Sequence, residues 1–248
     1  MKTRSPHRVA TRFASLFLTA VFASTSTSLL FSANGTWDGG GTDANWTTLG
    51  NWTGDAAFPG VTAGETNTDI ATFNAAIANT WGAPGTPILI DSASLNIRGI
   101  TFDTAAANYV IGTTGGNSLF LTSGGTIQVT NALTNAISSQ TINAPLVIVG
   151  ANGTYTFANN KNAPTASLVI GGAISGGTAG NTVLTFSSAQ SSAPNVVSGI
   201  ISNGLATSMG VNHASGTWTY SGNNTYTGNT TVNGGAANFS GTYSGGGA

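Results

Sequence analysis

The chain has 248 residues, of which only 5% are charged, 35 are glycine and none is cysteine. Soluble proteins are usually about 25% charged. A disordered chain would be strongly charged and poor in apolar residues, whereas this one is 40% hydrophobic. The lack of cysteine excludes a disulfide framework and a thiolate metal site. The composition therefore indicates an ordered fold that needs few charges, such as stacked short strands joined by Gly and Asn turns.

The net charge of −1 hides an uneven distribution of basic residues. Four of the six Lys and Arg residues lie in the first twelve positions. Only Arg98 and Lys161 then remain against seven acidic residues, which gives a net charge of −5 without that basic start. Such a chain cannot neutralise several phosphates, so nucleic acid is excluded as an expected partner.

The N-terminus has the order of segments that is typical of a secretory signal. Basic residues 1–12 precede an apolar run, 13–23, and a small polar run, 24–28. Cleavage after Ala23 or after Ala33 fits, and both sites stay open. The alternative is an uncleaved membrane anchor, because the apolar stretch is long enough to span a bilayer, although the polar run interrupts it. We expect a secreted or cell-surface protein with no stable membrane span after leader removal.

The expected organisation is a signal peptide over residues 1–33, an N-terminal cap over 34–86 and a solenoid over 87–248. In the cap, three tryptophans (Trp37, Trp46 and Trp52) lie among Gly, Asp and Asn, which is turn-rich sequence. Residues 69–73 alternate as a short strand. A solenoid needs a cap because its ends expose hydrophobic faces and strand edges.

Short apolar runs recur after residue 87 between Gly, Asn, Thr and Ser breaks, and most alternate with polar residues, as a strand with one buried face does. The runs are 88–90, 95–97, 100–102, 109–111, 119–121, 127–129, 146–149, 155–157, 168–170, 183–186, 196–201 and 218–220. No helical periodicity persists, and residues 132–137 could form a single turn at most.

Two all-β architectures fit this pattern, a parallel solenoid and a sandwich of antiparallel strands. A sandwich usually has longer strands and more charged outer faces. Very short strands, many Gly turns and few charges favour the solenoid, because stacked coils let Asn and Thr form ladders in which charges would repel one another.

Residues 216–235 read GTWTYSGNNTYTGNTTVNGG, in which two alternating strands and two turns make about one solenoid coil. This stretch resembles the autotransporter-associated β-strand repeat, also called the passenger-associated transport repeat. Trp218 and Tyr220 replace the aliphatic pair of the family pattern, and one clear copy is present. The matching residues are Gly222, Asn224, Thr225, Tyr226, Gly228, Thr230, Val232 and Gly235.

The start of the chain is also similar to large surface proteins that carry such repeats, through WDGGG at 37–41, the pair Asn51 and Trp52, and the segments 69–73 and 99–103. The resemblance implies a bacterial passenger domain with a right-handed parallel β-helix behind a Trp/Gly-rich cap. It implies a structural or adhesin-like role without catalysis or cofactor, in which the repeat assists export and folding. The implied partners are the export machinery and surface glycans or matrix.

The chain departs from the family in one respect. Autotransporters end in a membrane β-barrel of alternating segments of about ten residues, a pattern that the residues up to Ala248 do not carry. We therefore expect a fragment, a shortened product or a protein exported by another route.

A parallel β-helix can also be a polysaccharide-processing enzyme, which is the first alternative. Asp91 and Asp103 could face one groove and supply the two carboxylates of glycoside hydrolysis, but turn and strand-edge roles are favoured. A lyase would need a basic catalytic residue, and Arg98 and Lys161 lie in no recognisable motif.

Other side chains allow binding chemistry that the sequence favours less. Asp38, Asp43 and Asp55 could bind Ca²⁺, but their spacing matches neither an EF-hand nor an RTX nonapeptide and Asx-turn hydrogen bonds are favoured, so no metal is expected. The three cap tryptophans could form a sugar platform, which makes a carbohydrate-binding module the second alternative, although packing within the cap is favoured. His213 could serve a Ser-His-Asp site, but without a G-x-S-x-G sequence it is expected to be an exposed or locally bonded loop residue.

Overall fold

A computed structural model describes residues 33–62, 64, 66–77, 79–134, 138–190 and 195–245. The leader expected over residues 1–33 lies outside the described residues except for Ala33. The single turn allowed over residues 132–137 lies outside them from residue 135 onward.

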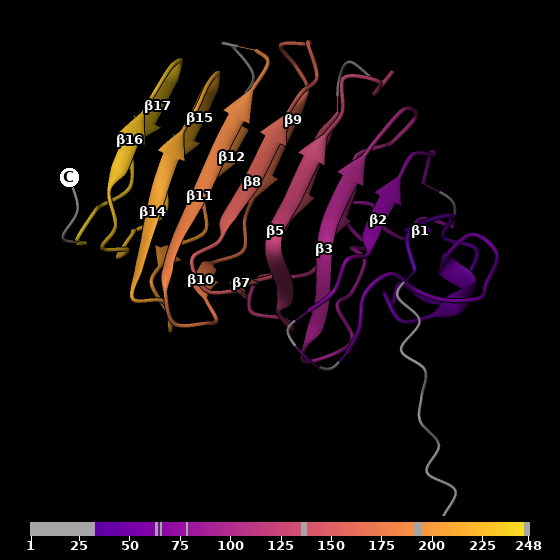
Figure 1. The fold of residues 1–248 in the computed structure, drawn as a ribbon. Helices are drawn as coiled ribbons and strands as arrows, with labels where there is room; N and C mark the ends of the chain where they lie inside the picture. The colour runs from indigo at the N-terminus through magenta and orange to yellow at the C-terminus, as the bar shows by residue number, and fades with distance from the viewer. Residues whose placement is uncertain are drawn as a thin grey trace, which may run out of the picture. The chain divides into compact units, whose positions relative to one another are not determined.

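The described chain consists of parallel strands coiled into a β-solenoid, so the expected fold class is confirmed and the antiparallel sandwich is excluded (Figure 1). Its helical content is a single 3-10 turn, η1 (Leu49–Asn51), among the described residues. The main sheet runs through β1 (Gly35–Thr36), β2 (Ile70–Phe73), β3 (Leu95–Phe102), β5 (Leu119–Val129), β8 (Thr154–Asn159), β11 (Asn181–Ser188), β14 (Ser208–His213) and β16 (Thr230–Val232).

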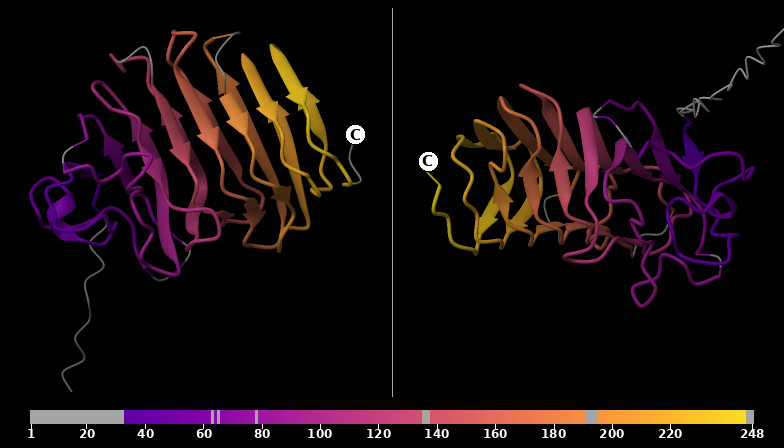
Figure 2. Two further views of the ribbon diagram at one scale, coloured as in Figure 1. Left: turned by 180° about the vertical axis from the view of Figure 1, so that it is seen from behind. Right: turned by 90° about the horizontal axis from the view of Figure 1, so that it is seen from below.

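Two further rows of strands close each coil. A short row pairs with the start of β5 and comprises β7 (Leu146–Ile148), β10 (Ile174–Gly176) and β13 (Ile201–Ser202). The third row is a separate sheet of β4 (Val110–Ile111), β6 (Ser139–Ile142), β9 (Ser167–Ile170), β12 (Asn195–Val197), β15 (Thr217–Tyr220) and β17 (Ala236–Phe239). This sheet lies behind the main one in Figure 1 and faces the viewer in the left view of Figure 2, and the chain winds from β7 through β8 to β9 in the right-handed sense.

The coils shorten toward the C-terminus. Ile127 pairs with Phe157, Phe157 with Phe186, Phe186 with His213, and His213 with Val232, so successive steps take 30, 29, 27 and 19 residues. The coils become shorter without a change in the register of the main-sheet strands. Each of these strands still pairs in parallel with the equivalent strand of the coil before it.

Apolar side chains from the three rows converge on one continuous core, in which each residue stacks on its equivalent in the next coil. The short row contributes the ladder Leu119, Leu146, Ile174 and Ile201, and the third row contributes Ile111, Ile142, Ile170, Val197 and Tyr220. The main sheet adds stacked rings, since Phe157 and Phe186 have centroids 4.9 Å apart with planes 15° apart. Burial of these ladders is the main stabilising term of the fold.

Several runs that read as separate strands are joined in the structure. The runs 95–97 and 100–102 form the single strand β3, with a register shift between Ile97 and Gly99. The runs 119–121 and 127–129 are likewise the two ends of β5. Residues 88–90 form only isolated bridges, from Ile88 to Ile111 and from Leu89 to Asn45.

The cap region, 34–86, contains two strands of the solenoid as well as loops. The strand expected at 69–73 is β2, and β1 and β2 both pair in parallel within the main sheet. The loops between them gather the three tryptophans, with Trp37 and Trp52 joined by an antiparallel bridge. Coil geometry therefore begins inside the cap region.

Candidate functional site

The repeat motif forms one coil that runs from β15 through a bridge at Asn224 to β16. Residues 221–227, expected as a turn followed by a short strand, alternate exposed and buried throughout. The second strand expected over residues 225–227 is not formed, because the only pairing in this stretch is the bridge between Asn224 and Tyr243. The segment is held by separate backbone hydrogen bonds, such as that from the Thr225 amide to the Ile201 carbonyl at 2.9 Å, and by side-chain hydrogen bonds.

The glycines of the motif are required by close contact with the coil before them. A Cβ atom at Gly222 would lie less than 3.0 Å from the carbonyl oxygen of Gly199, and one at Gly235 would collide in the same way with Gly216. At Gly228 the hypothetical Cβ would lie 2.5 Å from the Met209 carbonyl oxygen. Gly235 also has a φ of 76°, which L side chains rarely adopt. These glycines set how closely neighbouring coils approach.

Asn224 links the motif to the coils on both sides, and Tyr226 makes a hydrogen bond within the motif. The Ile201 amide donates to Asn224 Oδ1 at 2.9 Å, and the Asn224 amide donates to the Thr242 carbonyl at 2.8 Å. The Tyr226 hydroxyl is 2.7 Å from Thr230 Oγ1, and burial raises the pKa of Tyr226. Both side chains are buried, so these motif positions have packing roles.

Thr225 is exposed, and Val232 is 52% exposed although it pairs with the buried His213 on the inward side of the main sheet. Thr231, beside Val232 in β16, continues the outward ladder of the main sheet from Asn212. The motif therefore supplies both the stacking contacts and part of the outer surface.

An incomplete second copy follows the motif at a spacing of 19 residues. β15 and β17 pair with Thr217 opposite Ala236 and Tyr220 opposite Phe239, and Asn224 is bridged to Tyr243 at the same spacing. Tyr220 and Phe239 stack with centroids 4.8 Å apart. The sequence predicts one clear copy only, although Gly216 and Gly235, and likewise Gly222 and Gly241, repeat at this same spacing.

The acidic residues of the cap take part in local turns. Asp38 Oδ1 accepts from the Gly40 amide, and Asp43 Oδ1 accepts from the Asn45 amide, each at 3.0 Å. Asp55 is exposed with a φ of 52°. Within the described parts of the chain, no three His, Cys, Asp or Glu residues gather as a metal site would need.

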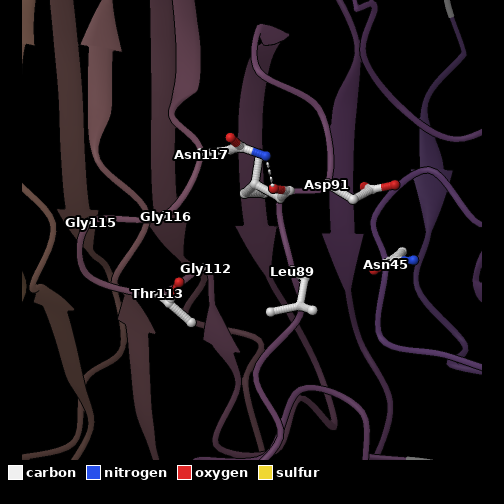
Figure 3. A pocket seen from close by; sticks show the side chains of 9 residues that line it. Asn45, Leu89, Asp91, Gly112, Thr113, Gly115, Gly116 and Asn117 are labelled. Atoms are coloured by element: carbon white, nitrogen blue, oxygen red, sulfur yellow. Dashed lines mark hydrogen bonds between the residues drawn. The ribbon is translucent and has the colours of Figure 1, made fainter.

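Asp91 lines a polar groove of about 440 Å³ (Figure 3). Leu89 forms its floor between Asn45 and Thr113, and Asn117 closes one side by donating to the Ile90 carbonyl at 2.9 Å. The Asp91 carboxylate accepts from the Thr47 amide at 3.0 Å and from the Thr47 hydroxyl.

Asp103 does not line this groove, so the hypothesis that the two aspartates share one groove is wrong. The Asp103 carboxylate instead accepts from the Thr130 hydroxyl at the end of β5. Asp91 is the one carboxylate among the groove's lining residues, and glycoside hydrolysis by paired carboxylates needs a second.

The three cap tryptophans are buried and pack against one another. Trp37 and Trp52 meet edge to face at 5.1 Å, and Trp46 and Trp52 at 4.9 Å. The indole of Trp46 donates to the Pro59 carbonyl at 2.8 Å, and that of Trp52 to the Trp46 carbonyl at 2.7 Å. With exposed fractions of 0–1% they cannot present a flat sugar-binding platform.

His213 ends β14 and is fully buried, so the expectation of an exposed loop histidine is wrong, whereas local bonding is observed. Its Nδ1 lies 3.1 Å from the Tyr220 hydroxyl, and its Nε2 lies 3.3 Å from the Gly216 carbonyl oxygen. Burial lowers the pKa of His213, opposed in part by the carbonyls of Gly216 and Gly234. These partners leave it no place in a serine triad.

No protein-family model, curated protein or solved structure matches the chain. Among the residues that the structure describes, no helix is long and apolar enough to cross a membrane. The features on which a function can be based are therefore the stacked repeat coil, the sequence pattern of the N-terminal residues and the outer faces of the solenoid.

Proposed function

We propose that the chain is a structural, adhesin-like segment of an exported bacterial surface protein, and that its repeat coil helps the solenoid to fold after export. The observation that carries the proposal is the contact of Gly222, Gly228 and Gly235 with the coil before them. These contacts, with the hydrogen bonds of Asn224, can form only when that coil is in place. The repeat therefore favours coil-by-coil assembly, in which each coil is stabilised mainly by its neighbour.

This mode of assembly suits a protein that folds outside the cytoplasm. Its core ladders and stacked backbone use no cysteine, and the sequence carries none. The basic and apolar N-terminal residues have the sequence of a secretory leader. A solenoid that grows on an existing coil needs no disulfide and no partner chain to specify its register.

The outer face of the main sheet offers a surface for contact with glycans or matrix. Its outward ladder runs through Thr126, Thr156, Thr185, Asn212 and Thr231, one residue from each successive strand. Hydroxyl and amide groups at the regular spacing of neighbouring strands, about 4.8 Å, suit hydrogen bonding to a repetitive polar ligand. Catalysis is not part of the proposal.

Export is tested by fractionating bacteria that produce the full chain. The unaltered protein should be recovered outside the cytoplasm and shortened at its N-terminus, with mass spectrometry deciding between cleavage after Ala23 and after Ala33. The double variant Leu16→Arg, Leu18→Arg, which breaks the apolar run of the leader, should stay in the cytoplasm at full length. Retention of the unaltered chain in the cytoplasm would contradict the proposal.

A further inference from the structure

A hollow of about 420 Å³ lies on the outer face of the main sheet where β2, β3 and β5 run side by side. Along the outward ladder, Ile70 pairs with Gly99 and Gly99 with Thr126. Gly99 has no side chain, so the ladder is interrupted between an isoleucine and a threonine. The hollow is thus built by a glycine at a position that carries side chains in the neighbouring coils.

Arg98 lies at the edge of this hollow, and its guanidinium group forms no ion pair with the described residues. The register shift between Ile97 and Gly99 sets it off the regular ladder, and its side chain is exposed. One guanidinium nitrogen, Nη2, lies 3.5 Å from the point that a Cβ of Gly124 would occupy. Within the described part of the chain the guanidinium makes no hydrogen bond or ion pair. Its five N–H donors are therefore available to an acidic ligand.

The opposite side of the hollow carries neutral hydrogen-bonding groups. Gln128 Nε2 donates to Thr101 Oγ1 at 3.4 Å, and Asn160 Nδ2 donates to Gln128 Oε1 at the same distance. Both bonds are long, so a ligand hydroxyl can compete for either partner at low cost. Thr126 adds a hydroxyl, and Ile70, 38% exposed, adds an apolar surface.

We propose that this hollow binds a carboxylate-bearing sugar residue of an acidic polysaccharide. A guanidinium pairs with a carboxylate through two parallel hydrogen bonds, the threonine and glutamine groups match ring hydroxyls, and Ile70 can cover a C–H face of the ring. A volume of about 420 Å³ lies within the usual range of small-ligand sites. The inference rests on the proposed function, because it names the class of glycan that the surface segment would contact.

The sugar, rather than any anion, is favoured by the composition of the hollow. A site for a simple anion would need several donors that converge on one point. Here the Arg98 guanidinium lies opposite the neutral side chains of Thr101 and Gln128, with Gly99 between them. The net charge of −5 that follows from two basic and seven acidic residues after residue 12 gives no long-range attraction for polyanions. Recognition therefore depends on local contacts and is expected to be weak for a single sugar unit.

The test is a titration of the purified ¹⁵N-labelled chain followed by NMR. The probes are a short galacturonate oligomer, the neutral galactose oligomer of the same length, and sodium acetate at equal carboxylate concentration. The galacturonate oligomer should give saturable shifts in β3 and β5. Arg98→Gln should weaken its binding at least tenfold, and Thr126→Val should weaken it severalfold without altering the charge. Lys161→Gln, which removes the same charge away from the hollow, should bind as the unaltered chain does.

Three results would overturn the inference: equal binding by Arg98→Gln, equal weakening by Lys161→Gln, or acetate shifts that match those of the oligomer. The Arg98 side chain is exposed and makes no hydrogen bond or ion pair among the described residues, so unchanged thermal unfolding of Arg98→Gln would show that any loss is one of binding. The titration uses purified protein, so it can fail while the export experiment succeeds, and the reverse also holds.

Discussion

Gly222 lies directly on Gly199 of the preceding coil, so closely that a Cβ at Gly222 would collide with the Gly199 carbonyl oxygen. The same relation joins Gly199 to Gly172 and Gly241 to Gly222. One corner of the solenoid is therefore a column of glycines, each of which permits the next coil to approach. The motif glycine is one member of this column.

Substitution of a column glycine should destabilise the solenoid through steric overlap. We expect Gly222→Ala to lower the free energy of unfolding by about 1–3 kcal/mol, the usual cost of overpacking, because the obstructing atom belongs to backbone that cannot rotate away. Urea unfolding followed by circular dichroism measures it. The matched control is Gly85→Ala, where an added Cβ has no atom within 4 Å. Equal midpoints for both variants would refute the steric role of the column.

Asn195 should be the most sensitive of the buried polar residues. Its Oδ1 accepts from Asn159 Nδ2 at 2.8 Å and from the Leu168 amide at 3.0 Å, and its Nδ2 donates to the Thr217 carbonyl at 3.0 Å. Asn195→Ala removes all three hydrogen bonds, and a buried group left unsatisfied costs about 1–3 kcal/mol, so a loss of at least about 2 kcal/mol is expected.

The control for Asn195→Ala is Asn238→Ala, which truncates an exposed asparagine of β17. Its effect on the urea midpoint should be within about 0.5 kcal/mol. If the two variants unfold at the same urea concentration, the buried amide network does not contribute as described.

His213 should make stability depend on pH just below neutrality. Burial lowers its pKa from the ordinary 6.5, so the folded state prefers the neutral ring. Above the ordinary value both states are neutral and the contribution is constant. As the pH falls below 6.5, the unfolded state binds a proton first and stability declines until the folded pKa is passed.

The decline should appear in urea midpoints measured between about pH 7.5 and 5.5, a range above the ordinary titration of Asp and Glu. It should be absent in His213→Phe, which extends the ring ladder of Phe157 and Phe186. The comparison uses the slope with pH, because the lost bond to Tyr220 changes absolute stability. An unchanged slope in the variant would assign the pH dependence to other groups.

The short strands rich in apolar residues could be predicted from the sequence, whereas the polar ones could not. The runs 155–157, 168–170 and 183–186 lie in β8, β9 and β11 because apolar residues alternate there. β6 and β14 are among the strands that the sequence does not predict, as are β1, β10 and β17, and Ser, Thr, Gln, Asn and Gly make up half or more of β6 and of β14. They form strands because the neighbouring coil supplies a hydrogen-bonding template, and because a buried polar side chain such as Gln140 finds backbone partners.

The repeat coil could be predicted from the sequence in outline, whereas its incomplete second copy and the hollow beside Arg98 could not. Its glycine spacing is visible in the sequence, yet Ala236 and Ala237 replace the residues that would have marked the second copy. The hollow beside Arg98 draws Ile70, Arg98 and Thr126 from three coils, and only the register brings them together. Distances of about thirty residues between such partners leave no local pattern to detect.

The groove at Asp91 should have a structural role. Purified protein is expected to leave acidic and neutral polysaccharides at full length, as judged by size-exclusion chromatography. Asp91→Ala should lower stability by about 1 kcal/mol through loss of the two hydrogen bonds from Thr47, a modest cost because the site is exposed. If the unaltered protein shortens a polysaccharide and Asp91→Ala does not, the enzyme alternative would be favoured instead.

The most direct test of the central claim is the amount of folded, protease-resistant chain that reaches the outside of the cytoplasm in Gly222→Ala and Gly85→Ala. If the repeat assists folding of an exported solenoid through its glycine contacts, Gly222→Ala should reduce this amount severalfold, while Gly85→Ala should match the unaltered protein. Equal amounts of resistant exported chain in all three would contradict the claim.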